Sequence, residues 1–475
     1  MKRRKKPPTI PIGTSGSGFF KRRIEILVSD AKTHFHILGT SGSGKSRLLA
    51  SLYLSLLKNG LAATLIDPHG DLAKLVLAQL TSDGFFSTPD AFEKLIYLDL
   101  PTGEDKGLYV PFNVLKQPLP PHTVASNIKE SMHRAWPALA GGSAPMFDTL
   151  VQDGCKVLIT NQLPLTSLYR LLTDKAFRDQ LLENEQDPDI VAFFHDQFDR
   201  LSLRDQADQA GSALRRAHLL TFSPILKYSL GQTENRLNFR EIIDRDQSVI
   251  INLALTDSEA RRLLGCLLTV SAEHGSLSRA SLPYEERENS HHLFIDEFSE
   301  FSAQSEEALA RMLSLTRKYG LFLVMAHQTW SQASERLRGA LQNVGVEVAF
   351  RLGRSDAQHT AMIMGRVDPE TVKHVVAQGE ERSHPLFYSL PEQWERLTQE
   401  LQDQPPRHFM FKTAQGKTIR GKTLDMKNPV VDPNLLKRIQ DEYLSRYFVP
   451  QETVVAEKEK SQEPAEKVIF RRNKL

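Results

Sequence analysis

The sequence predicts an α/β fold with a mostly parallel central sheet that is interrupted by an all-helical insertion. Two observations carry this prediction. Short apolar runs with the length of buried strands alternate with longer amphipathic stretches, from about residue 24 to 120 and again from about residue 247. Between these two parts hardly any strand-like run occurs, and the apolar residues recur with helical spacing. One α/β domain split by a helical insertion accounts for both observations.

The individual elements follow from these runs. The first part is expected to contain strands over 33–38, 62–66 and 95–98 and helices over 45–57 and 72–80. In the insertion, the clearest helices are expected over 147–158 and 205–220. The second part is expected to contain helices over 259–272 and 306–319 and strands over 248–253, 293–296, 321–326, 346–351 and 408–411.

These elements divide the chain into five segments. We expect a basic flexible segment (1–23), the first part of the α/β core (24–120), the all-helical insertion (121–246), the second part of the core (247–425), and a C-terminal helix with a disordered charged tail (426–475). The basic segment contains eight cations before the first acidic residue: Lys2, Arg3, Arg4, Lys5, Lys6, Lys21, Arg22 and Arg23. These cations could have a binding role, in which they contact phosphates or anionic lipid. The alternative is that they form a solvated tail.

Composition narrows the class of protein. The 475 residues carry a net charge of only +2, so the whole chain is not a polycation suited to coat nucleic acid. No apolar run reaches the roughly 18 residues of a membrane helix, which predicts a cytoplasmic protein. Cys155 and Cys266 match no metal-ligand spacing, and we expect two buried, reduced thiols.

A phosphate-binding loop is the strongest motif. Residues 39–46, Gly-Thr-Ser-Gly-Ser-Gly-Lys-Ser, fill the pattern G-x-x-x-x-G-K-[ST] between an expected strand and an expected helix. The glycines let backbone N–H groups surround a phosphate, and the helix N-terminus adds partial positive charge. The motif therefore predicts an ATP site made by Gly39, Thr40, Ser41, Gly42, Ser43, Gly44, Lys45 and Ser46. Lys45 is expected to reach the β- and γ-phosphates, and Ser46 to bind Mg²⁺.

An acidic strand end is the second motif. Three apolar residues, 293–295, precede Asp296 and Glu297. We expect Asp296 to hold Mg²⁺, mostly through water, and Glu297 to polarise the water that attacks ATP. Two adjacent acids favour hydrolysis over nucleotide binding alone.

Two later residues complete the expected site. Gln328 follows the strand 321–326, where its amide can sense the γ-phosphate or orient water. Arg317 lies at a helix end, where it either acts as an arginine finger on a neighbouring subunit's nucleotide or complements the helix dipole. Arg351 and Arg354 are alternative fingers.

Five stretches in order resemble the HerA/FtsK superfamily of hexameric DNA pumps, and within it the coupling-protein ATPases of conjugative type IV secretion. They are the phosphate-binding loop, Asp67–Asp71, Pro111–Asn113, Ile295–Phe298, and Arg317–Gly320 leading to Gln328. The resemblance implies a RecA-like core, a homo-hexamer, ATP and Mg²⁺ as cofactors, and DNA bound without sequence preference. It also implies the roles given above for Lys45, Ser46, Asp296, Glu297, Gln328 and Arg317. His69 and Asp71 are expected only to shape the loop near the phosphates.

This chain departs from those coupling proteins, which generally begin with transmembrane helices. We therefore expect either docking on a membrane-bound secretion or relaxosome partner, which would hold the chain at the inner face of the cell membrane, or a soluble relative with another task.

Three functions remain open on the sequence. The first is an ATP-driven DNA translocase for conjugative transfer, the second a HerA-like helicase or translocase that works with a nuclease in DNA processing or defence, and the third an ATPase that moves or assembles proteins. The sequence does not favour a metal site at His291 and His292, because no second ligand cluster lies at a suitable spacing.

Overall fold

The computed structural model describes residues 7–16, 20–136, 145–287, 289–298, 306–330, 335–341, 344–378, 382–413 and 416–453. The chain divides into two compact units. The first, here called the sheet unit, groups Met1–Asp99, Glu130–Ser143 and Asn238–Asp441, and the second, the helical unit, groups Leu100–Lys129, Ala144–Leu237 and Glu442–Leu475. Residues 100–120, expected in the α/β core, thus belong to the helical unit.

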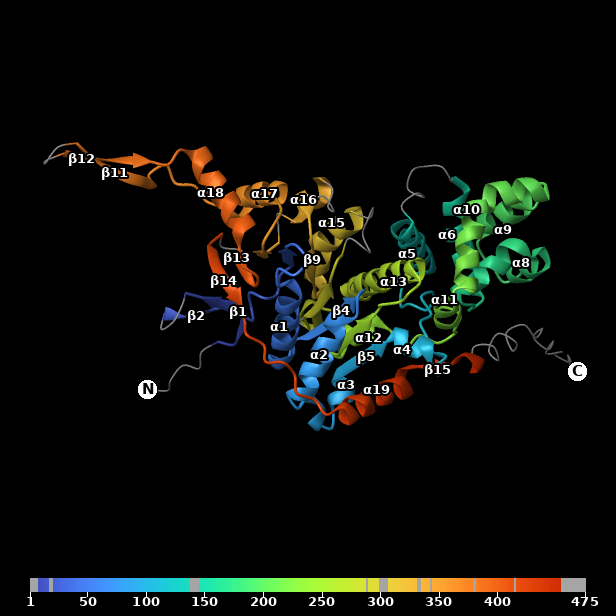
Figure 1. The fold of residues 1–475 in the computed structure, drawn as a ribbon. Coiled ribbons are helices and arrows are strands. Elements are labelled where there is room, and N and C mark those ends of the chain that lie inside the picture. Colours follow the sequence, from blue (N-terminus) through green and yellow to red (C-terminus); the bar gives the residue numbers. More distant parts are fainter. Residues whose placement is uncertain are drawn as a thin grey trace, which may run out of the picture. The chain divides into compact units, whose positions relative to one another are not determined.

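In the sheet unit, seven neighbouring strands of an 11-stranded sheet are parallel and reach one of its edges. Their spatial order is β10 (Val346–Ala349), β3 (Phe35–Leu38), β9 (Leu321–His327), β8 (His291–Ile295), β4 (Ala62–Asp67), β7 (Ser248–Asn252) and β5 (Leu95–Asp99). Figure 1 labels β9, β4 and β5 among them. Every residue in these strands is buried, which explains why the sequence shows continuous apolar runs and not alternation. The predicted α/β class with a mostly parallel central sheet is confirmed.

Four antiparallel strands extend this sheet beyond β10. They are β13 (His408–Thr413), β14 (Thr418–Thr423), β1 (Thr9–Ser15) and β2 (Arg22–Leu27), in that order. The prediction of a flexible segment over 1–23 is wrong for residues 9–15 and for Arg22 and Arg23, which form strands. The cations from Lys2 to Lys6 lie outside the described residues.

The strand β1 was missed because its Pro and Gly residues suggested a loop. Ile10 and Ile12 alternate with more exposed neighbours and are buried, as expected for a strand with one face on the core. A Cβ atom at Gly13 would lie 2.4 Å from the Lys422 carbonyl oxygen, so the close pairing of β1 with β14 requires glycine there.

Helices connect the strands of the sheet unit. The longer ones are α1 (Lys45–Lys58), α2 (Asp71–Ser82), α13 (Ser258–Leu277), α15 (Glu306–Leu315), α17 (Arg354–Met364) and α18 (Leu390–Asp403). Short helices are η2 (Phe85–Ser87), α3 (Ala91–Lys94), α12 (Phe239–Asp244), η6 (Ser278–Ser281), η7 (Tyr284–Arg287), η8 (Thr316–Tyr319) and α16 (Glu335–Leu341). A separate hairpin pairs β11 (Val372–Gln378) with β12 (Arg382–Phe387).

The helical unit agrees with the helical periodicity of its sequence. It contains α4 (Leu100–Asp105), α6 (Pro145–Thr160), η4 (Leu165–Ser167), α7 (Leu168–Thr173), α8 (Lys175–Leu182), α9 (Pro188–Ala192), the π-helix η5 (Phe193–Phe198), α10 (Leu203–Phe222) and α11 (Pro224–Ser229). Its described strands are β6 (Leu108–Tyr109) and β15 (Val449–Pro450), which pair with each other. The helices α5 (Pro121–Ala135) and α19 (Pro433–Tyr447) have residues in both units.

Three further expectations can be compared with the structure. Cys155 and Cys266 are buried and form no disulfide, as predicted. In the described part of the chain, no helix combines the length and the apolar character needed to cross a membrane. The predicted disordered tail lies, from residue 454 onward, outside the described residues.

Candidate nucleotide site

The phosphate-binding loop lies where its motif requires, between the end of β3 and the start of α1. Gly42 and Gly44 have φ values of 71° and 117°, in the left-handed region that favours glycine. A Cβ atom at Gly39 would lie 2.6 Å from Cβ of Phe350, so the loop needs this glycine for packing. The main chain therefore turns tightly and begins a helix at Lys45, as a phosphate cradle does.

A cavity of about 590 Å³ opens beside this loop within the sheet unit. It is lined by Thr40, Ser41, Gly42, Gly44, Lys45, Ser46, Arg47, Asp67, His69, Asp71, Leu72, Asp296, Glu297, Gln328, Pro406 and Arg407. The strand order explains this gathering, because β9 lies between β3 and β8 and all three strands are parallel. Residues that follow the carboxyl ends of these strands meet at one edge of the sheet. The structure thus brings together Lys45, Ser46, Asp296, Glu297 and Gln328.

Lys45 is buried inside the cavity wall. Its Nζ donates to the carbonyl oxygen of Gly39 and lies 3.9 Å from Oε1 of Glu297. Burial lowers the pKa of Lys45, and the carboxylates of Glu297 and Asp296 act in the opposite direction. The ammonium group is therefore held between the loop and the two acids.

Glu297 adopts a conformation that is unusual for a residue with a side chain. Its φ is 48°, in the left-handed region, two residues after the end of the extended strand β8. Its Oε1 accepts a hydrogen bond of 2.9 Å from Nε2 of Gln328. Strained backbone at the mouth of a cavity is a common feature of catalytic groups, and here it turns the carboxylate toward Gln328 and Lys45.

The environment of Asp296 disfavours the ionised form of its carboxyl group. Burial, together with the nearby carboxylates of Asp67 and Glu297, raises its pKa to about 6, although Lys45 opposes the shift. Asp67 is buried as well, and its two oxygens accept from the backbone N–H groups of His69 (2.9 Å) and Ala73 (2.8 Å) at the start of α2. A cluster of three buried carboxylates favours the binding of a cation.

The residues at the cavity fit a Mg²⁺–nucleotide. Oxygen atoms are the preferred ligands of Mg²⁺, and the Ser46 hydroxyl and the Asp296 carboxylate are oxygen groups at this cavity that would suit it. No atom lies within 4 Å of the position of a Cβ at Gly42, so the backbone there is open to a phosphate. The hydroxyl of Ser43 is buried inside the loop and does not line the cavity, so it is not among the groups that face a ligand.

Sequence reasoning missed two residues of this site. Asp67 was noted in the sequence only as part of a motif. Its position at the end of a strand that is followed by a helix could have identified it as a residue of the site. Arg407 lines the cavity from the turn after α18; its backbone N–H donates to the Ser43 carbonyl at 2.7 Å. The guanidinium of Arg407 donates to the carbonyl oxygens of Thr423 and Leu424, at 3.0 and 2.9 Å. The Pro405–Pro406 pair marked a turn but did not indicate where it would lie.

The three candidate arginine fingers lie outside the set of lining residues. Arg317 is exposed in η8. The Arg351 carbonyl accepts from the Thr40 backbone N–H at 3.0 Å, so this residue borders the loop through its main chain. Arg354 forms an exposed ion pair of 2.7 Å with Glu395.

The other predicted features have local structural roles. His69 and Asp71 line the cavity and are exposed, in agreement with a place beside the phosphate site. In the helical unit, Asn113 accepts from the Leu115 backbone N–H at 3.0 Å and shapes its own turn. His291 and His292 are buried and hydrogen-bonded to the Thr64 hydroxyl and the Ala31 carbonyl oxygen.

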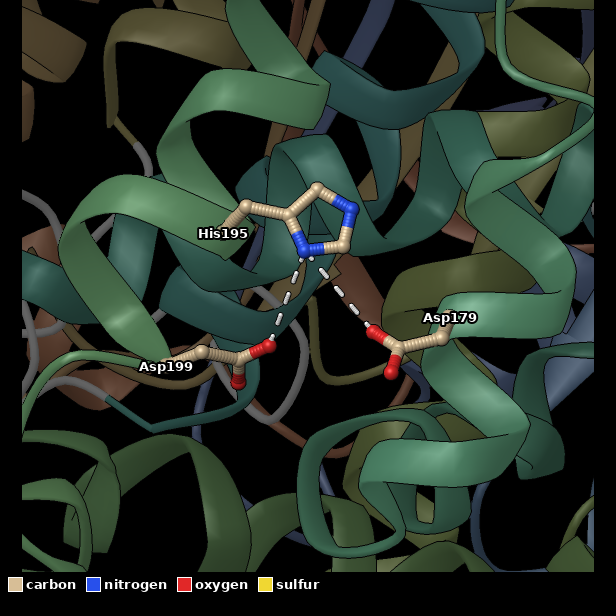
Figure 2. Close-up of side chains that lie close together, drawn as sticks. All are labelled: Asp179, His195 and Asp199. Atoms are coloured by element: carbon tan, nitrogen blue, oxygen red, sulfur yellow. Dashed lines mark ion pairs between the residues drawn. The ribbon is translucent and has the colours of Figure 1, made fainter.

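One group in the described part of the chain has metal-like spacing, and it lies in the helical unit. Figure 2 shows His195 between the carboxylates of Asp179 and Asp199, with Nδ1 at 3.8 and 4.0 Å from their oxygens. Lys175 and Arg178 already pair with Asp199, and Lys175 also reaches Asp179 at 3.2 Å. The cations of the chain thus balance both acids, and the cluster joins α8 to the π-helix.

Comparison with known proteins agrees with this geometry. Residues 19–106 match a protein family described as "Helicase HerA, central domain". Three solved structures share the fold. The bacterial conjugative coupling protein TrwBdeltaN70 is 16% identical, with 86% of this chain and 89% of that chain covered and a TM-score of 0.55. The plasmid coupling protein TrwB in complex with ADP and Mg²⁺ is 17% identical, with 85% and 89% covered and a TM-score of 0.54. VirB4 of Thermoanaerobacter pseudethanolicus is 13% identical, with 89% and 98% covered and a TM-score of 0.58.

A search among curated proteins gave no match. The predicted resemblance to P-loop ATPases of the HerA/FtsK type is confirmed by the family match and by the shared fold of the coupling protein and VirB4. At these identities the structural likeness establishes the fold, and the residue roles rest on the geometry of the cavity.

Proposed function

We propose that this chain is an ATP-driven DNA translocase of the coupling-protein type, which works as a homo-hexameric ring in conjugative DNA transfer. The observation that supports this most is the meeting of Lys45, Ser46, Asp296, Glu297 and Gln328 at one cavity. That set contains a phosphate-binding cation, two oxygen ligands for a metal, a base and an amide, as ATP hydrolysis requires.

The loop and its helix hold the nucleotide. The ammonium of Lys45 and the backbone N–H groups of residues 40–46 bind the phosphates of ATP, except the N–H groups of Thr40 and Ser43, which donate to the carbonyl oxygens of Arg351 and Thr40. Ser46 and Asp296 would hold Mg²⁺, which when bound neutralises charge on the β- and γ-phosphates. TrwB, which shares this fold, has been solved in complex with ADP and Mg²⁺, and this supports a nucleotide with Mg²⁺ as the ligand here.

Glu297 and Gln328 act on the water. The Glu297 carboxylate orients the attacking water and accepts its proton as the water attacks the γ-phosphorus. The Gln328 amide, which donates to Oε1 of Glu297 at 2.9 Å, fixes the direction of that carboxylate. In the ring, we assign the stabilisation of charge on the γ-phosphate to Arg317 of an adjacent copy, because Arg317 is exposed and outside the cavity of its own chain.

The decisive experiment measures ATP hydrolysis by the full-length protein with and without single- and double-stranded DNA. We expect DNA to stimulate hydrolysis, and Lys45→Ala and Glu297→Gln to abolish it. Lys45→Ala should also weaken nucleotide binding, whereas Glu297→Gln should leave it nearly intact. Hydrolysis that DNA does not change would refute the DNA motor and favour an ATPase that moves or assembles proteins.

The match to the HerA central domain favours one alternative, a soluble translocase that works with a nuclease in DNA processing or defence. Co-purification separates the two. Capture of a relaxase or a membrane-bound secretion component supports conjugation, and capture of a nuclease supports processing. In the first case the protein is held at the inner face of the cell membrane by that partner.

The N-terminal cations can be tested without damage to the fold. Because residues 9–15 and 22–27 are strands, only Lys2, Arg3, Arg4, Lys5 and Lys6 should be replaced, by serine. If these cations dock the protein, the replacement lowers membrane recruitment or DNA affinity. If both are unchanged, the segment has no docking role.

A further inference from the structure

Two buried histidines connect the strand that leads into the phosphate-binding loop with the strand that leads to Gln328. His36 lies in β3 and His327 ends β9; they are 3% and 0% exposed. Leu38 pairs with His327 in the sheet register, so His36, two residues earlier, lies on the same face as His327. Nε2 of His36 and Nε2 of His327 are 2.7 Å apart, which is a hydrogen-bond distance.

The hydrogen bonds determine which nitrogens carry protons. Nδ1 of His327 lies 3.0 Å from the Thr329 carbonyl oxygen, which can only accept, so Nδ1 of His327 carries a proton. In a neutral imidazole the other nitrogen is then an acceptor. His36 must therefore donate from its own Nε2–H. Burial supports two neutral rings, since it lowers the pKa of His36 to about 3 and that of His327 well below its ordinary value.

His327 also contacts both other parts of the nucleotide site. Its carbonyl oxygen accepts from the backbone N–H of Gly39, the first residue of the loop, at 3.2 Å. Its ring packs against Phe298, the residue after Glu297, with ring centroids 4.7 Å apart. A displacement of His327 would thus also displace the phosphate-binding loop, the residues after β8 and Gln328.

We propose that His36 and His327 form a positioning pair, in which the directed chain from His36 through His327 to the Thr329 carbonyl fixes the main chain around Gln328. The Gln328 amide is thereby held toward Glu297. The inference rests on the ATPase activity proposed above and adds two residues that do not contact the nucleotide cavity. Trp330 continues the support, since its indole N–H donates to the Thr360 hydroxyl at 2.8 Å and its ring lies 5.0 Å from that of His36.

The first test compares two replacements of His36 in the full-length protein. His36→Leu removes the donor and should lower kcat for ATP about 10- to 100-fold, because a small displacement of a catalytic group has effects of that size. The KM should change less than about threefold, since the groups that bind phosphate are intact. His36→Gln keeps an N–H near the position of Nε2 and should restore kcat. His291→Leu, which removes a buried histidine from the far end of β8, is the matched control and should leave kcat unchanged.

A double-mutant cycle separates positioning from general damage. In a Gln328→Ala background, His36→Leu should have little further effect on kcat, because both changes remove the same contribution. An equal fall in kcat in both backgrounds would overturn the proposal. So would a His36→Leu variant that hydrolyses ATP like the wild type.

The protonation of the two histidines can also be measured directly, without an ATPase assay and in the wild-type protein. Imidazole ¹⁵N NMR of the nucleotide-free, full-length protein distinguishes protonated from unprotonated ring nitrogens. We expect neutral His327 protonated at Nδ1 and neutral His36 protonated at Nε2, assigned with His36→Gln and His327→Asn. A cationic ring or the opposite tautomer at His327 would overturn the pair. Loss of hydrolysis in the wild type would instead count against the proposed function.

Discussion

At the scale of single residues, the nucleotide site concentrates charge that the fold does not neutralise. Asp296 and Glu297 are adjacent, Asp67 lies close by, and Lys45 is the cation held against them. Asp67 is partly compensated by two backbone N–H groups, whereas Asp296 accepts only from the Glu297 N–H in the structure described. The free energy lost in burying Asp296 as an anion is recovered when a cation binds.

This imbalance predicts a stabilising mutation. The pKa of Asp296 is about 6 in the folded protein and near 3.8 in the unfolded chain, so the folded state binds the proton more tightly. Between these values stability falls as pH rises, and above pH 6 the full penalty applies. Asp296→Asn should therefore stabilise the nucleotide-free protein by about 1–3 kcal/mol at pH 8 and hardly at all at pH 4.

Urea unfolding at the two pH values measures this difference. Asp71→Asn is a suitable control, because Asp71 lines the same cavity but is exposed. A destabilised Asp296→Asn protein at pH 8 would show that Asp296 is compensated by groups other than those described.

At the scale of elements, a buried ion cluster joins three helices of the sheet unit. Glu273 in α13 accepts from Arg311 in α15 at 2.9 Å and faces Arg134 in α5 at 3.5 Å. Glu130, also in α5, contacts both arginines, at 2.7 and 3.0 Å. The Glu273 side chain is fully buried and that of Arg134 is 2% exposed. Two acids and two bases balance one another, so removal of Glu273 leaves two arginines with a single carboxylate and an excess of buried positive charge.

Glu273→Ala should accordingly destabilise the protein by about 3–5 kcal/mol. Glu442→Ala, which breaks the exposed pair with Arg446 in α19, should change stability by less than about 1 kcal/mol. Chemical denaturation of both variants tests this contrast. Equal effects would mean that burial does not determine the contribution of these pairs.

At the scale of the whole molecule, the nucleotide cavity and the candidate finger are in different places on one chain. Arg317 does not line the cavity described here, although it precedes the strand that leads to Gln328. A ring places the exposed surface of one copy against the next, and heterologous contacts of this kind close into rings. In the proposed ring, the site would be completed by Arg317 of the adjacent copy.

A mixing experiment tests the finger in trans. Lys45→Ala and Arg317→Ala subunits should each be inactive in hydrolysis. A one-to-one mixture should regain about one quarter of the wild-type rate, because one interface in four combines an intact Lys45 with an intact Arg317. No recovery would exclude Arg317, and the same design then applies to Arg351 and Arg354.

The sequence predicted the parts of the fold that depend on short-range pattern. The seven parallel strands and the phosphate-binding loop were identified because continuous apolar runs and a contiguous motif require no knowledge of distant contacts. The strand β1 was missed because its Pro and Gly residues suggested a loop and because its pairing with β14 is set by the tertiary fold. Arg407 was missed for the same reason, since its contact with Ser43 is set by the tertiary fold. The His36–His327 pair could not be predicted either, because it depends on β3 and β9 being neighbours in the sheet, and the sequence does not determine the strand order.

The place of β1 in the sheet has a consequence for the synthesis of the protein. The ribosome makes the β1–β2 hairpin well before β14, the other neighbour of β1 in the sheet, which follows about four hundred residues later. At about 5–20 residues per second the hairpin waits roughly 20–80 seconds with one edge unpaired. During this time the unpaired edge of β1 can pair with another nascent chain. The exposed charges of Arg22 and Arg23 on β2 protect only the outer edge of the hairpin, so we expect chaperones to bind this hairpin until β14 is made.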